Sequence, residues 1–281
     1  MLTLMRFPNG KRKALTLSYD DGVIEDIRLI EILNKYGIKG TFNLNSGLFA
    51  EEDTVLGSPL RRMSKKQCIE LYKSSPHEVA VHGFTHPCWD RIPSDRIVFD
   101  IIEDRRNLEN IFERNVRGCA YPMGVVSDTA VEALRMCGIA YARTTVSTEN
   151  FHLPVDWLRM PATCHHNNPR LFELCDEFLN DNHPFNNCIF YLWGHSYEFD
   201  DMDNWDVIEK FAEKMGGHND VWYATNMEIY EYVNAYNSLD FTADGRFVTN
   251  STLIDVFIEQ CTGRNGTVYK IPSGERVQIL D

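Results

Sequence analysis

Short apolar runs alternate along the chain with longer segments in which apolar residues recur every three or four positions. In the clearest example, residues 15–19 alternate as in a β-strand, and residues 24–33 carry isoleucine and leucine at a helical spacing that Gly37 ends. Alternation of strands with helices is typical of βαβ units, whose strands are parallel. The pattern therefore predicts an α/β protein built on a parallel sheet.

The same rhythm continues through most of the chain. Further predicted strands cover residues 40–44, 78–81, 119–121, 139–142, 188–193 and 221–225. Predicted helices begin near Ser64, Ser94, Asp128, Pro169 and Met227. From about Leu239 a turn at 243–245 and strands over 267–271 and 277–280 indicate a change of character. We predict a (β/α) domain over residues 1–238 and a small β-rich extension over residues 239–281.

Composition narrows the classes of partner. The chain of 281 residues has 28 basic and 41 acidic side chains and a formal charge of −13, which disfavours binding to nucleic acid or to anionic membranes. No signal peptide is visible in the first fifteen residues, and no apolar run approaches the roughly 18 residues of a membrane helix. We therefore expect a cytoplasmic protein, with the oligomeric state left open.

The eight cysteines form no C-x-x-C pair, a pattern typical of reduced core thiols.

Polar clusters follow three of the predicted strands. Asp20 and Asp21 follow the first strand, His82 and His86 follow the strand over 78–81, and His195 follows the strand over 188–193. In parallel α/β barrels, the loops at the carboxyl ends of the strands open onto one face. The three clusters are therefore expected to converge.

These residue types suit hydrolysis at a metal ion. Two imidazoles and one carboxylate leave coordination positions open, as in catalytic zinc sites. A bound divalent ion lowers the pKa of water to about 7, so a second carboxylate beside it can take the proton. His195 can protonate a leaving amine. On the residues alone the structural alternatives stay open, because paired aspartates often form turns, and isolated histidines are more often structural.

The ordered motifs resemble those of a known family. Ser18-Tyr19-Asp20-Asp21-Gly22 is similar to the first motif of the polysaccharide deacetylases, carbohydrate esterase family four of the NodB-homology superfamily, and His82 and His86 match its H-x-x-x-H motif. The resemblance covers about residues 15–236. It implies a distorted, incomplete (β/α) barrel of the TIM-like, seven-stranded type, here followed by a small C-terminal β appendage.

The resemblance also implies roles for single residues. Asp20 corresponds to the catalytic base and His195 to the general acid. The ligands of the divalent metal, which we expect to be zinc, correspond to Asp21, His82 and His86. Ala120-Tyr121-Pro122 resembles the third motif, so the backbone amide of Tyr121 is expected to bind the oxyanion.

Several positions depart from the family pattern. The arginine that orients the base in many members is absent, because Cys119 and Ala120 occupy that part of the third motif. Arg143 and Arg159 are the candidates to replace it, and Arg159 is our choice for a substrate-binding role. The fourth motif is only echoed by Asp156-Trp157, and the fifth reads Leu192-Trp193-Gly194-His195-Ser196. Among the aromatic residues, Trp193 is the one that we expect to stack on a sugar ring.

These inferences lead to one main expectation and two alternatives. The main expectation is a metal-dependent deacetylase, a hydrolase of carbohydrate metabolism that removes acetyl groups from an N- or O-acetylated carbohydrate or a small acetylated substrate. The first alternative is hydrolysis of a non-peptide C–N bond in a small amide, motivated by the absence of a visible export signal. The second is a carbohydrate-binding protein with impaired catalysis, motivated by the missing arginine of the third motif.

Overall fold

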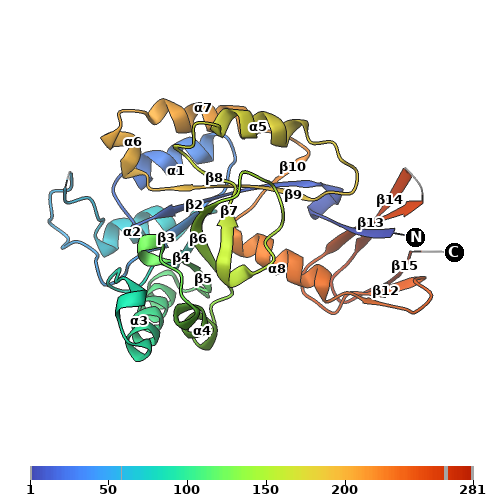
Figure 1. The fold of residues 1–281 in the computed structure, drawn as a ribbon, viewed down its shortest axis with the longest axis horizontal. Coiled ribbons are helices and arrows are strands. Elements are labelled where there is room, and N and C mark those ends of the chain that lie inside the picture. Colours follow the sequence, from blue (N-terminus) through green and yellow to red (C-terminus); the bar gives the residue numbers. More distant parts are fainter. Residues whose placement is uncertain (1, 58, 263–264, 280–281) are drawn as a thin grey trace.

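A computed structural model describes residues 2–57, 59–262 and 265–279 (Figure 1). Within these residues the main element is a nine-stranded sheet in the order β7-β6-β5-β4-β3-β2-β9-β8, with β10 paired to β2 on the same sheet. All of the strand pairs in this sheet are parallel. Its strands are β2 (Lys13–Asp20), β3 (Thr41–Leu44), β4 (Glu78–Val81), β5 (Gly118–Ala120), β6 (Tyr141–Ser147), β7 (Met160–Ala162), β8 (Cys164–His165), β9 (Cys188–Gly194) and β10 (Val221–Tyr223).

Helices cover both faces of the sheet. Figure 1 shows α1, α5 and α7 along one side and α2, α3 and α4 along the other. The α-helices are α1 (Asp26–Lys35), α2 (Lys65–Tyr72), α3 (Ser94–Phe112), α4 (Asp128–Met136), α5 (Leu171–Asn180), α6 (Tyr197–Asp201), α7 (Trp205–Met215) and α8 (Asn226–Asn237). Short 3-10 turns lie at η1 (Pro8–Gly10), η2 (Trp89–Arg91), η3 (Pro122–Gly124) and η4 (Trp157–Arg159).

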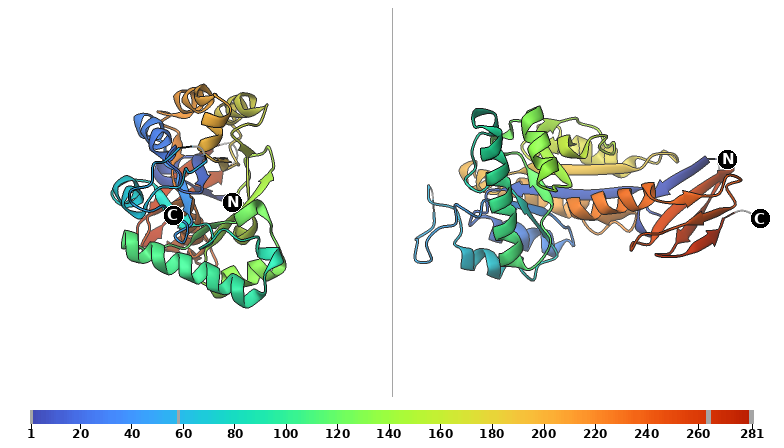
Figure 2. Two further views of the ribbon diagram at one scale, coloured as in Figure 1. Left: turned by 90° about the vertical axis from the view of Figure 1, so that its left-hand side faces the viewer. Right: turned by 90° about the horizontal axis from the view of Figure 1, so that it is seen from below.

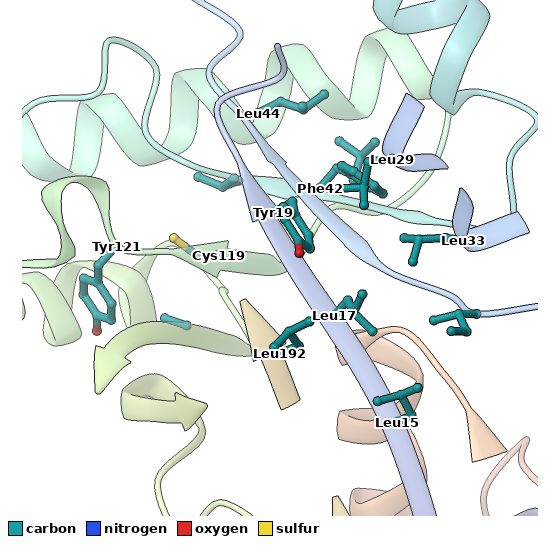
Figure 3. Packing of buried hydrophobic residues seen from close by; sticks show 14 of the residues in the cluster. Leu15, Leu17, Tyr19, Leu29, Leu33, Phe42, Leu44, Cys119, Tyr121 and Leu192 are labelled. Carbon is teal, nitrogen blue, oxygen red and sulfur yellow. The ribbon is translucent and has the colours of Figure 1, made fainter. Parts of the chain in front are cut away.

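The sequence explains why β2 lies at the centre. All eight of its residues are buried, as expected for a parallel strand that is covered on both faces. Leu15, Leu17 and Tyr19 lie along this strand, with Leu29 and Leu33 of α1 in the same core (Figure 3). At the carboxyl edge of the sheet Asp21 and His195 are partly exposed, whereas Asp20 and His82 stay buried.

The sheet curls into an incomplete barrel, as the family resemblance implied. β7 contacts β9 and β8 contacts β6, so the two ends of the sheet approach each other. In the described part of the chain no ladder joins β7 to β8. The fold is therefore an α/β fold of the distorted (β/α) barrel type.

The C-terminal residues form two small antiparallel sheets at one end of the molecule (Figure 2). One contains β11 (Asp240–Phe241), β12 (Phe247–Thr249) and β15 (Arg276–Gln278), and the other contains β1 (Leu2–Arg6), β13 (Val256–Thr262) and β14 (Asn265–Ile271). The first strand of the chain thus pairs with the C-terminal region. The division of the chain into two domains at residue 238 stays a prediction. The pairing of β1 with β13 means that the first residues of the chain also belong to the C-terminal sheets.

Most of the predicted elements are present, with shifts at their ends. Ser127 caps α4 in place of Asp128, and α5 begins at Leu171, after Pro169. The predicted strand over 277–280 corresponds to β15, and its last residue, Leu280, lies outside the described residues. The periodicity did not reveal β1, β13 or α7. All eight cysteines are free and seven of them are buried, which confirms the prediction of core thiols.

Among the described residues, no helix combines the length and the apolar character needed to cross a membrane.

Candidate active site

The predicted clusters meet at the carboxyl edge of the parallel sheet. Asp20 ends β2, His82 follows β4, and His195 follows β9. β4, β3, β2 and β9 are consecutive neighbours in the sheet, so residues far apart in the sequence lie side by side at this edge. The expected convergence is therefore present.

Asp21, His82 and His86 form a group that can hold a metal ion. Their ligand atoms all lie within 4.8 Å of one another. Asp21 Oδ1 is 4.0 Å from His82 Nε2 and 3.8 Å from His86 Nε2, and the two Nε2 atoms are 3.1 Å apart. One carboxylate and two imidazoles are the donors of an open, catalytic type of zinc site.

The tautomer of His82 suits this role. His82 Nδ1 lies 2.9 Å from the carbonyl oxygen of Ala120, which can only accept, so the ring proton is on Nδ1 and the lone pair of Nε2 faces the group. Burial, together with the adjacent His82, lowers the pKa of His86 to about 4. His86 is thus in the neutral form that binds metal at neutral pH.

Two aspartates of α3 hold the loop that carries the histidines. Asp104 accepts the backbone N–H of His82 at 3.1 Å, and Asp100, one helical turn earlier, accepts the backbone N–H of Thr85 at 3.1 Å. Gly83 has a φ of +77°, and a Cβ there would lie 2.6 Å from Asp100 Oδ2. The loop therefore depends on both the glycine and the carboxylates behind it.

Arg62 fixes the orientation of Asp21. Its guanidinium donates to Asp21 Oδ1 at 2.7 Å and to the backbone oxygen of Asp21 at 2.7 Å. Asp21 has a φ of +85°, which is uncommon for a residue with a side chain and marks a shaped turn. Arg62 was not among the site residues predicted from the sequence.

Asp20 lies in the centre of the candidate site. It is buried and forms an ion pair with Arg143, and the side-chain amide of Asn43 donates to its Oδ1 at 2.8 Å. Its Oδ2 lies 3.8 Å from His82 Nε2 and 3.8 Å from His195 Nε2. Burial raises the pKa of Asp20, but Arg143 and the neighbouring histidines outweigh it, and the pKa falls to about 2. Asp20 is therefore a carboxylate at neutral pH.

The structure distinguishes the two arginines that the sequence left open. Arg143 is the direct neighbour of Ala120 across the β5–β6 ladder, so its side chain reaches Asp20 from the strand next to the third motif. Arg159 is partly exposed and pairs with Asp128 and Asp156. Among the contacts of the described residues, none joins Arg159 to Asp20, so its predicted substrate-binding role receives no support from this geometry.

A second histidine cluster adjoins the site, and the sequence reading missed it. Glu198 of α6 lies 3.1 Å from His165 Nε2, 3.1 Å from His166 Nε2 and 3.5 Å from His195 Nδ1. Burial opposes ionisation of Glu198, but contacts with the three histidines hold its pKa far below the usual value. The pKa of His195 is raised, because Glu198 and Asp20 outweigh the effect of burial. The feature of the sequence that could have indicated this cluster is the adjacent pair His165-His166 at the end of β8, the strand that pairs with β9.

Tyr121 and Trp193 are placed differently from our expectations. The backbone N–H of Tyr121 donates to the oxygen of Arg143 at 3.1 Å, so it is engaged in the sheet, and binding of an oxyanion requires this bond to open. Trp193 is only 9% exposed, and the guanidinium of Arg143 lies over its ring at 4.4 Å. The structure therefore gives Trp193 a packing role in place of the expected sugar stacking.

An open pocket of about 340 Å³ borders the candidate metal group. Its lining residues are Asp21, Val23, Pro59, Arg61, Arg62, Tyr197 and Asp201. Tyr197 is half-buried, and its ring centroid lies 5.1 Å from that of His195. Tyr197 is thus an aromatic side chain in the wall of this pocket, beside His195.

Comparisons with known proteins agree with this fold. Residues 7–142 match the family model described as Polysaccharide deacetylase. A Mycobacterium smegmatis protein that is proposed to be a polysaccharide deacetylase has a similar structure, with a TM-score of 0.58, 16% identity, and coverage of 83% of this chain and 94% of that one. A family 4 carbohydrate esterase from Streptomyces lividans, solved with acetate, aligns with a TM-score of 0.50 and 13% identity over 76% of this chain and 93% of that one.

Another match is partial. The Streptococcus pyogenes deacetylase PplD, in complex with acetate, is 24% identical over 46% of this chain, with a TM-score of 0.40. This chain spans 55% of the length of PplD. No curated protein sequence matches the chain significantly.

A parallel α/β barrel with an Asp-His-His group at its carboxyl edge is the class of protein that the fold and the site define. The chain is similar to the polysaccharide deacetylases, in sequence over residues 7–142 and in fold over most of its length.

Proposed function

We propose that the protein is a metal-dependent hydrolase that removes acetyl groups from an N- or O-acetylated carbohydrate. The observation that carries this proposal is the position of Asp20, an ionised carboxylate 3.8 Å from one imidazole of the Asp21-His82-His86 group. A spare carboxylate beside a set of metal ligands is the arrangement that hydrolysis of an acyl group needs.

Asp21, His82 and His86 would hold the ion, which we propose to be zinc. When bound, it would supply Lewis acidity, polarising the acetyl carbonyl and making water more acidic. Arg62 and the loop around Gly83 orient these ligands from outside, as the outer partners of metal ligands commonly do.

The remaining residues would handle protons. Asp20 would accept the proton of the attacking water at its carboxylate, while Arg143 and Asn43 fix the orientation of that carboxylate. His195 would donate a proton from Nε2 to the departing amine or alcohol. Its raised pKa favours the protonated form that this step requires. The backbone N–H of Tyr121 is the proposed donor to the oxyanion, once it is released from Arg143.

The test is release of acetate from acetylated oligosaccharides. We expect the zinc- or cobalt-loaded wild type to release acetate, and a chelator to stop it. Asp20→Asn should lower kcat by about 10²- to 10⁴-fold, the usual contribution of a general base. Asp206→Asn, which removes an exposed carboxylate paired with Lys210, is the matched control and should keep full activity.

Other outcomes identify the alternatives. Equal activities of wild type and Asp20→Asn would refute the role of Asp20. Turnover of a small amide with a product other than acetate would favour the small-amide hydrolase. Stoichiometric sugar binding without turnover in the metal-loaded protein would favour a binding protein.

A further inference from the structure

Glu198 presents one oxygen to three imidazole rings and one backbone amide. Its Oε2 accepts the backbone N–H of His195 at 3.1 Å and lies 3.1 Å from Nε2 of both His165 and His166. The same oxygen is 3.5 Å from Nδ1 of His195. The carboxylate is thus fixed from β8, from the end of β9 and from its own helix α6.

The hydrogen bonds behind the rings indicate which atoms carry protons. The backbone N–H of Asn167 donates to His165 Nδ1 at 3.2 Å, so the proton of neutral His165 is on Nε2, facing Glu198. The phenol of Tyr19 lies 3.3 Å from Nδ1 of His166, and as a donor it also leaves the ring proton on Nε2. Both rings therefore carry their proton on the nitrogen nearest the carboxylate, 3.1 Å from Glu198 Oε2.

These proton positions decide between two interpretations of the cluster. Its histidines could hold the carboxylate of Glu198, or they could bind a second metal ion together with it. His165, His195 and Glu198 are close enough to surround an ion. A metal ligand must offer a lone pair, however, and the lone pair of His165 is already used by Asn167 on the other side of the ring. The geometry therefore favours the first interpretation, in which His165 and His166 hold the carboxylate of Glu198; we call these three residues the carboxylate clamp.

We propose that Glu198 is a positioning residue for His195, and that His165 and His166 hold it in place. The inference rests on the proposed function, in which His195 Nε2 protonates the leaving group. The charge of Glu198, 3.5 Å from Nδ1, attracts a proton to that nitrogen, and Nε2 on the other side of the ring lies 3.8 Å from Asp20.

The surroundings make the clamp rigid. His166 is fully buried, and its ring lies 4.2 Å from the ring of Phe199. The ring of His165 packs against Trp193 at 4.5 Å. Trp193 in turn contacts Arg143, which pairs with Asp20, so packed side chains connect the clamp to the base. The burial of Trp193 thus contributes to the order of the site.

A leaving-group comparison tests the proposal in the metal-loaded full chain. An acetylated amine needs a proton on its leaving group, whereas an activated aryl acetate departs as a stable anion without one. Glu198→Gln keeps the shape but removes the charge. We expect it to lower kcat on the acetylated amine by roughly 10²-fold with KM nearly unchanged, and to lower aryl ester hydrolysis by less than about 3-fold. Glu198→Asp should restore part of the amide activity, and Glu209→Gln, at an exposed ion pair with Arg28, should change neither.

Equal losses on both substrates would overturn the proposal, because a structural defect does not depend on the leaving group. A second readout is independent of turnover: ¹⁵N NMR of the histidine rings should show His195 protonated at Nδ1 in the wild type and a tautomer mixture in Glu198→Gln. An unchanged His195 spectrum would also overturn it. A wild type that hydrolyses neither substrate, yet shows the expected spectra, would count against the proposed function and support the clamp.

The bound metal separates the clamp from a second cation site. We expect one divalent ion per chain, with the same count in His165→Ala. A second ion that disappears in His165→Ala would overturn the assignment of this cluster as a carboxylate clamp.

Discussion

Replacement of Arg143 by methionine should leave a buried carboxylate without its cation. The side chains of Arg143 and Asp20 are 1% and 3% exposed. Removing one member of such a buried pair costs about 3–5 kcal/mol, because the remaining charge stays desolvated. Within the described residues, the side-chain amide of Asn43 is the other side-chain donor to the Asp20 carboxylate, and a neutral amide cannot replace the guanidinium. We therefore expect Arg143→Met to lower the free energy of unfolding by about 3–5 kcal/mol.

A double-mutant cycle with Asp20→Asn measures the ion pair directly. Because the double variant contains no unpaired charge, it should be more stable than Arg143→Met alone, with a coupling energy of about 1–3 kcal/mol. Unfolding in urea with chelator present gives these values without a contribution from bound metal. Arg159→Met is the matched control, and its exposed ion pairs should contribute less than about 1 kcal/mol. Additive single variants, or an Arg143→Met protein within about 1 kcal/mol of wild type, would refute the reasoning.

Three further predictions follow from the structure. His86→Ala should weaken binding of zinc by more than about 10²-fold, since outer partners of ligands alone contribute 10- to 100-fold, whereas the exposed His152→Ala should bind normally in calorimetry. Gly83→Ala should lower the free energy of unfolding by about 1–3 kcal/mol more than Gly37→Ala, which has a similar positive φ but no neighbour within 4 Å of the added Cβ; equal losses would show that backbone strain alone matters. Burial raises the pKa of Glu78 to about 7, above its ordinary value of 4.5, so the folded protein loses stability as the pH rises through this interval. Glu78→Gln should remove up to about 3 kcal/mol of that loss, measured as the free energy of unfolding between pH 4.5 and 8. Wild type and variant with the same pH dependence would contradict the assignment.

Local pattern was sufficient for much of the fold. The strand over 78–81 coincides with β4, because a short apolar run between polar residues is itself the signal of a buried parallel strand. Ser64 begins α2 with a capping box, a feature that four consecutive residues define. Helix α7 was missed, although one of its faces is buried, because the preceding loop gave no clear start signal. Element boundaries shifted where tertiary contacts extend or shorten a strand, as in β6.

The candidate site was predictable where its residues are close in the sequence. Asp20-Asp21 and the His82–His86 spacing are local features, and the carboxyl edge of a parallel sheet is where such residues meet. Trp193 was placed at this edge correctly, yet its exposure depends on Arg143, which lies on another strand. Glu198 is only three positions from His195, but the other two rings beside it, His165 and His166, are more than thirty positions away, so the cluster was not visible in the sequence.

The sequence by itself determined the alternation of strands and helices and the presence of acid and imidazole groups at strand ends. These follow from hydrophobic periodicity and from residue type, which act over a few positions. The tertiary structure decided which arginine pairs with Asp20, which carboxylate contacts His195, and that β1 joins β13 near the end of the chain. Such pairings depend on strand order and register across the whole sheet. A single side chain finds its partner only when the packing of every intervening element has fixed the distance between them.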